Sequence, residues 1–247
     1  MKVILITGGT GLIGSVQVKY FLEKGYKVVT TYRNKDKFLG LGNHDNLFGV
    51  YVADLLSDNA AQLIFDGLQS LGLSPDCLVN NACDCRWHAM EQDGHVAGEC
   101  FVNQYKINVI LPYELSWKFV HAPDSRLKKI INVSSMYGLV PHNPQLYVNP
   151  MTETPLQYGV AKAAMIQLTK DLAIRFRDFG VVVNAVSYGG VDGRVDEDFK
   201  KRFEVLTPLR RMMKPEDTIP AVEFLINEES HYMTGQNIIV DGGRTVW

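Results

Sequence analysis

Two side chains that could exchange a proton with a substrate lie four residues apart in the segment Tyr158-Gly-Val-Ala-Lys162. In a helix this spacing places the phenol and the ammonium on the same face. A free tyrosine has a pKa of about 10, too high for acid–base work near neutrality, and a fixed cation beside it favours the phenolate. Tyr20 and Lys24 have the same spacing at the end of another expected helix, so a purely structural pair is the competing interpretation.

A glycine-rich turn follows the first apolar run of the chain, Val3–Thr7. Gly8, Gly11 and Gly14 leave room for backbone N–H groups to approach a pyrophosphate. The helix that they open points the positive end of its dipole at that anion. A strand, a glycine turn and a helix in this order predict a dinucleotide site, whereas the glycine pattern alone also fits an ordinary tight turn.

The composition narrows the class of protein. The 247 residues are 46% hydrophobic, which suffices for one packed core and predicts a single domain over residues 1–247. The net charge of −2 lacks the excess of positive charge that proteins binding nucleic acid or an anionic membrane surface carry. No stretch approaches the roughly 18 apolar residues of a spanning helix. We therefore expect a cytoplasmic protein with a small-molecule substrate and with neither nucleic acid nor membrane as a partner.

Strand-like and helix-like segments alternate along the chain, which predicts an α/β fold with a doubly wound parallel sheet of about seven strands. The expected strands are Val3–Thr7, Lys27–Tyr32, Phe48–Ala53, Cys77–Asn80, Lys129–Ser134, Val181–Ser187 and Asn237–Val240. The expected helices are Leu12–Lys24, Asn59–Leu71, Gly98–His121, Gln157–Phe179 and Pro215–Asn227. Pro141–Pro155 contains four prolines and is expected to be a loop, and Tyr188–Leu209 to carry a short mobile helix.

Five further motifs accompany the tyrosine–lysine pair in a fixed order. They are Asp54-Leu55, Asn80-Asn81-Ala82, Asn108, Asn132-Val-Ser-Ser135 and Thr234-Gly-Gln-Asn-Ile-Ile-Val-Asp-Gly-Gly243. With these motifs the chain resembles the short-chain dehydrogenases/reductases, in their single-domain branch, over nearly its whole length. The resemblance implies a Rossmann fold.

The resemblance also implies an NAD(P)-dependent oxidoreductase that interconverts a carbonyl and a secondary alcohol by hydride transfer. Tyr158 would exchange the proton and Ser135 would hold the substrate oxygen. Lys162 would lower the pKa of Tyr158 and bond the ribose hydroxyls, and Asn108 would fix a water that connects this lysine to solvent. The implied cofactor-binding residues are Gly8, Thr10, Gly11, Leu12, Ile13, Arg33, Asp54, Leu55, Asn81, Ala82, Tyr158, Lys162, Gly189 and Val191.

The chain departs from the family pattern at four positions. Leu12 occupies a glycine position of the single-domain branch, so that the glycine spacing is that of the extended branch. Cys83 replaces the last glycine of Asn-Asn-Ala-Gly, Tyr188 replaces a proline, and Gly193 replaces a threonine that holds the carboxamide. The nicotinamide end of the site therefore matches the family less well than the adenine end.

The end of the second expected strand bears on the choice of dinucleotide. An acidic side chain there would bond both ribose hydroxyls of NAD, but the chain has Tyr32 followed by Arg33. The guanidinium of Arg33 can pair with a 2′-phosphate and stack on adenine. Lys35 and Lys37 add positive charge, which Asp36 partly offsets. We therefore favour NADP, with NAD as the alternative.

The substrate is expected to be a sugar or a sugar derivative. The support is a resemblance of Met136-Tyr-Gly138, Tyr147-Val-Asn-Pro-Met-Thr152 and the ending Asp241-Gly-Gly-Arg-Thr-Val-Trp247 to a subgroup associated with surface-polysaccharide and flagellin-modification sugar pathways. The other interpretation is that the residues between Ser135 and Tyr158 are merely a long loop.

Two other functions remain open. A redox-neutral epimerase or dehydratase that recycles its cofactor fits the glycine spacing, although such enzymes usually carry a C-terminal domain for a nucleotide sugar, and this chain ends soon after its last strand. A non-catalytic dinucleotide sensor is disfavoured, because regulators of this ancestry tend to lose a member of the catalytic set. Here Asn108, Ser135, Tyr158 and Lys162 are all present.

The four cysteines are expected to be reduced thiols and no metal site is expected. Cys83-Asp-Cys85 lacks the usual spacing of a zinc pair and has no second Cys/His pair at ligand distance, although His88 and His95 are nearby. Cys77 lies in a strand pattern and is expected to be a small buried residue.

A homotetramer or homodimer is expected from the resemblance and from two long helices, Gly98–His121 and Gln157–Phe179. Each helix carries more apolar residues than one face against the sheet would use. The surplus residues are Trp117, Phe119, Ile166, Ile174 and Phe176. The alternative is that this surplus packs beneath loops.

Overall fold

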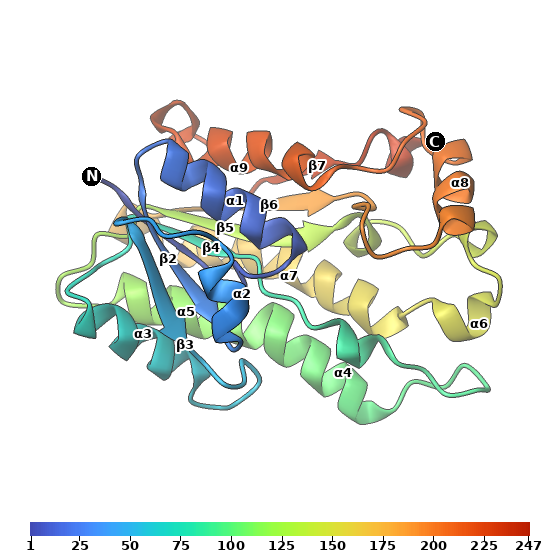
Figure 1. Cartoon of the computed structure of the whole chain (residues 1–247), viewed down its shortest axis with the longest axis horizontal. Helices are drawn as coiled ribbons and strands as arrows, with labels where there is room; N and C mark the ends of the chain where they lie inside the picture. The colour runs from blue at the N-terminus through green and yellow to red at the C-terminus, as the bar shows by residue number, and fades with distance from the viewer.

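The computed structural model describes all residues, 1–247, and contains one parallel sheet in the strand order β3-β2-β1-β4-β5-β6-β7 (Figure 1). All seven expected strands are present, with ends within two residues of the prediction. The strands are β1 (Val3–Ile6), β2 (Lys27–Tyr32), β3 (Leu47–Tyr51), β4 (Cys77–Asn80), β5 (Lys129–Ser135), β6 (Val182–Tyr188) and β7 (Asn237–Val240).

The central strands are buried on both faces. β1 reads Val-Ile-Leu-Ile and all four residues are buried, as expected for a strand covered by helices on both sides. β1 pairs with β2 on one side and β4 on the other, so the chain reverses its direction of winding at this point. In open parallel sheets ligands bind beyond the carboxyl ends of the strands at such a reversal.

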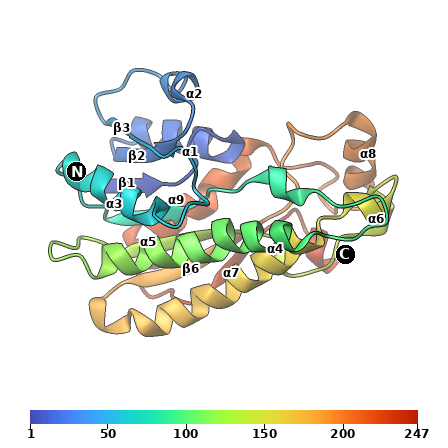
Figure 2. The same ribbon diagram turned by 90° about the horizontal axis from the view of Figure 1, so that it is seen from below.

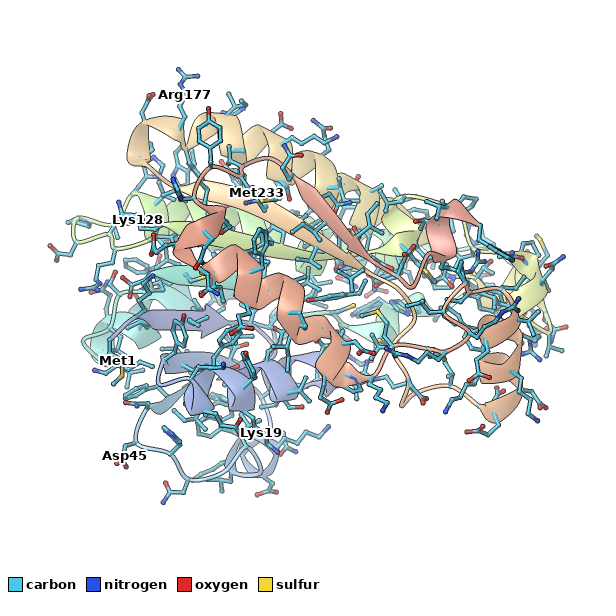
Figure 3. All side chains as sticks on the ribbon, turned by 90° about the horizontal axis from the view of Figure 1, so that it is seen from above. Met1, Lys19, Asp45, Lys128, Arg177 and Met233 are labelled. Atoms are coloured by element: carbon cyan, nitrogen blue, oxygen red, sulfur yellow. The ribbon has the colours of Figure 1, made fainter.

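Helices cover the two faces of the sheet in separate layers. Figure 3 shows α1 (Leu12–Glu23) and α9 (Ile219–Ile226) lying over one face. Their side chains Phe21 and Val222 belong to one apolar core. The opposite layer, seen from below in Figure 2, contains α3 (Ala60–Ser70), α4 (Gly98–Tyr105), α5 (Leu111–Val120) and α7 (Leu156–Arg175).

The helix expected over Gly98–His121 is interrupted by a π-helical turn at Lys106–Ile110. Pro112 has no N–H to donate to the carbonyl of Asn108, so the regular α-helical ladder cannot continue through this point. The interruption therefore places Asn108 in a π-turn, a feature that occurs frequently at functional sites.

The prediction that Pro141–Pro155 is all loop was wrong. Pro144–Leu146 forms a 3₁₀ turn, and Pro150–Glu153 forms the short helix α6. Both begin with a proline, which fits the first turn of a helix because the N–H there would be unpaired in any case. Prolines in this segment therefore begin short helices as well as interrupt helical structure.

Two other short helices lie near the carboxyl edge of the sheet. α2 (Lys35–Leu39) was not predicted, because its five residues are too few for a periodic pattern, and Asn34 Oδ1 caps it by accepting from Lys37 N at 2.9 Å. α8 (Glu197–Val205) is the short helix expected within 188–209, and Asp196 caps it at 2.7 Å.

The surplus apolar residues proposed for an oligomer interface divide into two groups. Phe119, Ile166 and Phe176 are buried within the chain, so this part of the prediction was wrong. Trp117 and Ile174 remain 40% and 64% exposed. The buried residues face the sheet or neighbouring helices, which a helical pattern alone did not distinguish. No helix of the chain combines the length and the apolar character needed to cross a membrane.

Candidate active site

A cavity of about 810 Å³ lies at the carboxyl edge of the sheet. It extends from the glycine turn after β1 to the first turns of α7, and α8 lines it through Phe199 and Phe203. Every predicted site residue except Asn108 lines this cavity. The topology therefore brings the two halves of the sequence-predicted site together in one space.

The glycine turn leaves the start of α1 open. Gly8 has a φ of +68°, which favours glycine, and a Cβ on Gly14 would lie 2.4 Å from the carbonyl oxygen of Gly8. No side chain caps α1 at Gly11, and the first turn has no acidic residue. Its N–H groups and its dipole are thus available to an anion, which fits the pyrophosphate of a dinucleotide.

The end of β4 holds the glycine turn in place. The backbone N–H groups of Asn81 and Ala82 both donate to Thr7 Oγ1 at 3.0 Å, and Asn81 Nδ2 donates to Thr7 O at 3.0 Å. Thr7 was predicted only as a strand residue. Its hydroxyl connects two loops that the sequence places more than 70 residues apart.

The opposite part of the cavity carries positive charge after β2. Arg33 and Lys37 are exposed and line the cavity, and no acidic residue follows Tyr32 directly. Asp54 Oδ1 accepts from Leu56 N at 3.0 Å, which forms the tight turn after β3. This end of the cavity therefore carries both cationic and acidic side chains, from the segments after β2 and β3.

The predicted proton-transfer residues meet near the ends of β5 and α7. Ser135 and Tyr158 line the same part of the cavity, and Ser135 Oγ accepts from Tyr137 N at 3.2 Å. Lys162 Nζ lies 5.7 Å from the centre of the Tyr158 ring and donates to Val133 O at 2.7 Å. A substrate oxygen placed there would be within reach of both the phenol of Tyr158 and the hydroxyl of Ser135.

The protonation states differ from those expected. Burial raises the pKa of Tyr158 above its ordinary value, Cys83 raises it further, and the bond from Ser135 opposes the shift. Burial also lowers the pKa of Lys162, whose ammonium bonds a backbone carbonyl. The raised pKa keeps Tyr158 protonated near neutral pH in the chain alone. The expected lowering of the tyrosine pKa by Lys162 stays a prediction.

Asn108 is fully buried and lies outside the cavity. Its Nδ2 donates to Gln104 O at 2.9 Å and to Gln104 Oε1 at 2.8 Å. Its Oδ1 is buried without a hydrogen-bond partner. A buried acceptor without a protein partner can accept a hydrogen bond from an ordered water. The role of Asn108 as a water ligand stays a prediction.

The departures from the family pattern are accommodated in different ways. Tyr188 is buried, and its hydroxyl donates to Thr218 O at 2.6 Å, which ties the end of β6 to the segment before α9. Gly193 has a φ of +116°, and a Cβ there would lie 3.4 Å from the Leu12 side chain. Cys83 faces the cavity.

The cavity also contains polar aromatic residues that sequence reasoning did not assign to the site. The His88 ring lies 4.7 Å from that of Tyr158, and His142 stacks on Tyr137 at 3.7 Å. Burial lowers the pKa of each histidine to about 4, so both are uncharged near neutrality. The hydroxyls of Tyr137 and Tyr147 lie 3.0 Å apart. In the sequence, these aromatic residues were indicated only by the resemblance of segments 136–138 and 147–152 to a sugar-pathway subgroup.

Comparison with known proteins places this site in a family. A family model described as enoyl-(acyl carrier protein) reductase matches residues 11–245. An uncharacterized oxidoreductase of Thermotoga maritima is 31% identical over 99% of this chain and 97% of its own length. The chain therefore belongs to the short-chain dehydrogenase/reductase family, whose members are nicotinamide-dependent oxidoreductases.

Two further similarities extend over nearly the whole chain. Sorbose reductase of Candida albicans is 29% identical, covering 99% of this chain and 87% of the relative. A structure of 4-hydroxyisoleucine dehydrogenase complexed with NADH has a TM-score of 0.85 and 27% identity, with full coverage of both chains. These similarities agree with the seven-stranded parallel sheet and leave the substrate open.

Proposed function

We propose that residues 1–247 act as one catalytic domain that transfers a hydride between NADP and a carbonyl or secondary alcohol. The observation that carries this proposal is the convergence of Ser135, Tyr158 and Lys162 in one cavity that is continuous with the open start of α1. The glycine turn would hold the pyrophosphate and the residues after β2 the adenosine. A bound nicotinamide ring supplies the hydride.

The roles of the side chains follow from their placement. Ser135 holds the substrate oxygen, and the protonated Tyr158 donates its proton to that oxygen as negative charge develops. Lys162 Nζ would bond the ribose hydroxyls of a bound coenzyme and would place a positive charge near the phenolate that remains. Asn108 Oδ1 holds a water that reconnects the lysine with solvent. In the oxidation direction the same groups act in reverse.

We infer a neutral polyhydroxylated substrate, a sugar or a sugar derivative. His88, His142, Tyr137 and Tyr147 offer uncharged hydrogen-bonding groups around Tyr158. Such groups suit hydroxyl-bearing substrates better than long apolar chains. The similarity to sorbose reductase supports the same class.

The first prediction concerns coenzyme consumption. With NADPH and a panel of ketoses, aldoses and keto-sugar derivatives, we expect one coenzyme molecule oxidised for each product molecule formed. Absorbance of NADPH and chromatographic quantification of the product give the two numbers. Product formation without net coenzyme oxidation would identify a redox-neutral epimerase or dehydratase instead.

The preference for NADP rests on charge at the adenine end. Arg33 and Lys37 line the cavity there, and the residue directly after β2 is not acidic. A guanidinium pairs with a phosphate through two charge-assisted hydrogen bonds. We therefore assign the 2′-phosphate to Arg33.

The second prediction tests this assignment. Arg33→Ala should weaken NADP binding by about 10–100-fold, the worth of hydrogen bonds to a charged group, and change NAD binding little. Lys35→Ala is the matched control, because Lys35 is a nearby exposed cation that does not line the cavity. Calorimetric titration gives both dissociation constants. Tighter binding of NAD than of NADP by the unaltered protein would reverse the assignment.

We also propose that the chain forms a homodimer or homotetramer through the outer surface of α4, α5 and α7. In Figure 2, α5 and α4 follow each other in one line on the face turned toward the viewer, and α7 lies beside them. These helices and the π-turn between α4 and α5 expose several large apolar side chains, and contiguous exposed apolar side chains mark protein–protein contact sites. The residues are Val102, Tyr105, Ile110, Trp117, Val160 and Ile174.

The third prediction is an oligomeric mass. Light scattering at micromolar concentration should give two or four times the chain mass of 27.7 kDa. Ile110→Lys should shift this mass toward the monomer, because it places a charge within an apolar contact. Leu39→Lys, an exposed position on α2 outside that surface, is the control. A monomeric mass for the unaltered chain would rule out this interface.

A further inference from the structure

Three metal-ligating side chains converge in the segment after β4. One ligand atom from each of Cys83, Cys85 and His88 lies within 4.8 Å of the other two. Sequence spacing did not predict this cluster, because Cys83-Asp-Cys85 lacks the usual spacing of a zinc pair and no second Cys/His pair follows it. His95, the other nearby histidine, is held instead by Glu91, with 3.4 Å between Nδ1 and Oε1.

The local backbone explains the convergence. Asp84 is extended, with φ −124° and ψ 104°, so the residues on either side of it project in the same direction. Cys85–His88 is a 3₁₀ turn, in which residues three apart lie one above the other. Asp84 Oδ1 caps that turn by accepting from Arg86 N at 3.1 Å. The sequence Cys-x-Cys-x-x-His thus becomes a single cluster.

The cluster contains a buried polar atom with no partner. His88 Nε2 is buried and makes no hydrogen bond. Buried polar atoms in native proteins are nearly always satisfied, by protein, water or an ion. The adjacent Asp84 carboxylate instead pairs with the Arg86 side chain at 2.9–3.0 Å. The two thiols offer the nearby metal-ligating atoms.

A cationic side chain contacts one of the two sulfur atoms. Arg194 Nη1 donates to Cys85 Sγ at 3.4 Å. Outer N–H donors of this kind orient and stabilise metal-bound sulfur. Two thiolates and an imidazole form a soft donor set that selects zinc-like ions over magnesium or calcium.

We propose that Cys83, Cys85 and His88 form a binding site for one zinc-class divalent cation, with its fourth coordination position open to the cavity beside Tyr158. Three protein ligands with one open position are typical of reactive rather than purely structural zinc sites. Ligand atoms around zinc lie about 3.5–3.8 Å apart, so closing the cluster requires side-chain shifts of about 1 Å. Cys83 and His88 line the cavity, which gives the fourth position access to a water or a substrate oxygen.

Titration of the reduced, chelator-treated full-length protein with Co²⁺ tests this site. We expect one equivalent to bind per chain with an intense thiolate-to-metal charge-transfer band, which one equivalent of Zn²⁺ abolishes. Cys83→Ser and Cys85→Ser should each reduce the band and weaken binding by more than about 100-fold, beyond the usual effect of an outer-sphere change. His88→Gln should weaken binding while keeping the sulfur band.

Cys100→Ser is the matched control, because Cys100 is buried in α4 and is not a member of the cluster. It should bind Co²⁺ like the unaltered chain. Circular dichroism melts establish that each variant is folded. Loss of the charge-transfer band in a folded Cys83→Ser or Cys85→Ser variant supports the site. No saturable binding at micromolar Co²⁺, equal binding by Cys83→Ser, or loss of the band in Cys100→Ser would overturn the proposal.

Discussion

Tyr158→Phe is expected to lower turnover by about 10²–10⁴-fold, the usual worth of a positioned acid–base group. Phenylalanine keeps the ring beside His88 and removes only the hydroxyl that would exchange the proton. Coenzyme affinity should therefore change little. Steady-state rates with a reducible sugar, together with a titration of NADPH, separate the two effects.

The chain provides its own control for this change. Tyr20 and Lys24 have the same spacing, and Lys24 Nζ lies 5.2 Å from the Tyr20 ring, close to the 5.7 Å of the catalytic pair. They lie on α1 outside the cavity, so Tyr20→Phe should leave turnover unchanged. Near-normal turnover of Tyr158→Phe would remove Tyr158 from the mechanism.

Lys162→Met is expected to impair both coenzyme binding and turnover. Methionine keeps much of the volume of the buried stem but has no ammonium to bond the ribose or to face the phenolate. We expect a loss of about 10–100-fold in NADPH affinity, as for hydrogen bonds from a charged group. Turnover at saturating coenzyme should fall by a further factor of about 100 or more.

Lys129 is the matched buried lysine. It begins β5, and its Nζ donates to Asn227 O and Ser230 Oγ, both at 2.9 Å. Lys129→Met should lower the thermal unfolding midpoint, because two acceptors lose a charged donor, and should leave coenzyme affinity intact. An unchanged NADPH dissociation constant in Lys162→Met would contradict the ribose role.

Much of the fold could be predicted from local patterns. A parallel strand that is buried on both faces reads as a continuous apolar run, and β1 and β4 do so without ambiguity. Short helices fixed by a single cap, such as α2, carry too few residues to show a period. The π-turn around Asn108 is set by the absent N–H of Pro112, which local helix propensity does not describe.

The site could be predicted in outline from motif order, since its residues follow the ends of successive strands. What the sequence could not supply was the environment of each group. The pKa of Tyr158 depends on burial and on Cys83, which faces it from another loop. The cluster of Cys83 with His88 depends on a turn that is only four residues long. These effects arise from contacts across the fold rather than from spacing.

The protonated Tyr158 of the free chain has a consequence for the direction of the reaction. A phenol whose pKa is raised is poised to donate a proton, which favours carbonyl reduction near neutrality. Oxidation of the alcohol needs the phenolate, so its rate should rise as the pH increases. A ligand that brings the Lys162 ammonium closer to the Tyr158 hydroxyl would lower the pKa of Tyr158. The two directions of the reaction would then differ less in their dependence on pH.

The central claim is that this cavity passes a hydride directly between coenzyme and substrate carbon. Incubation with NADPH that carries deuterium at the transferable position of the nicotinamide, followed by mass spectrometry of the product, tests it most directly. The account predicts one deuterium on the new carbinol carbon for each coenzyme molecule oxidised. A product whose carbinol hydrogen comes from solvent, or that forms while the coenzyme keeps its label, would contradict it.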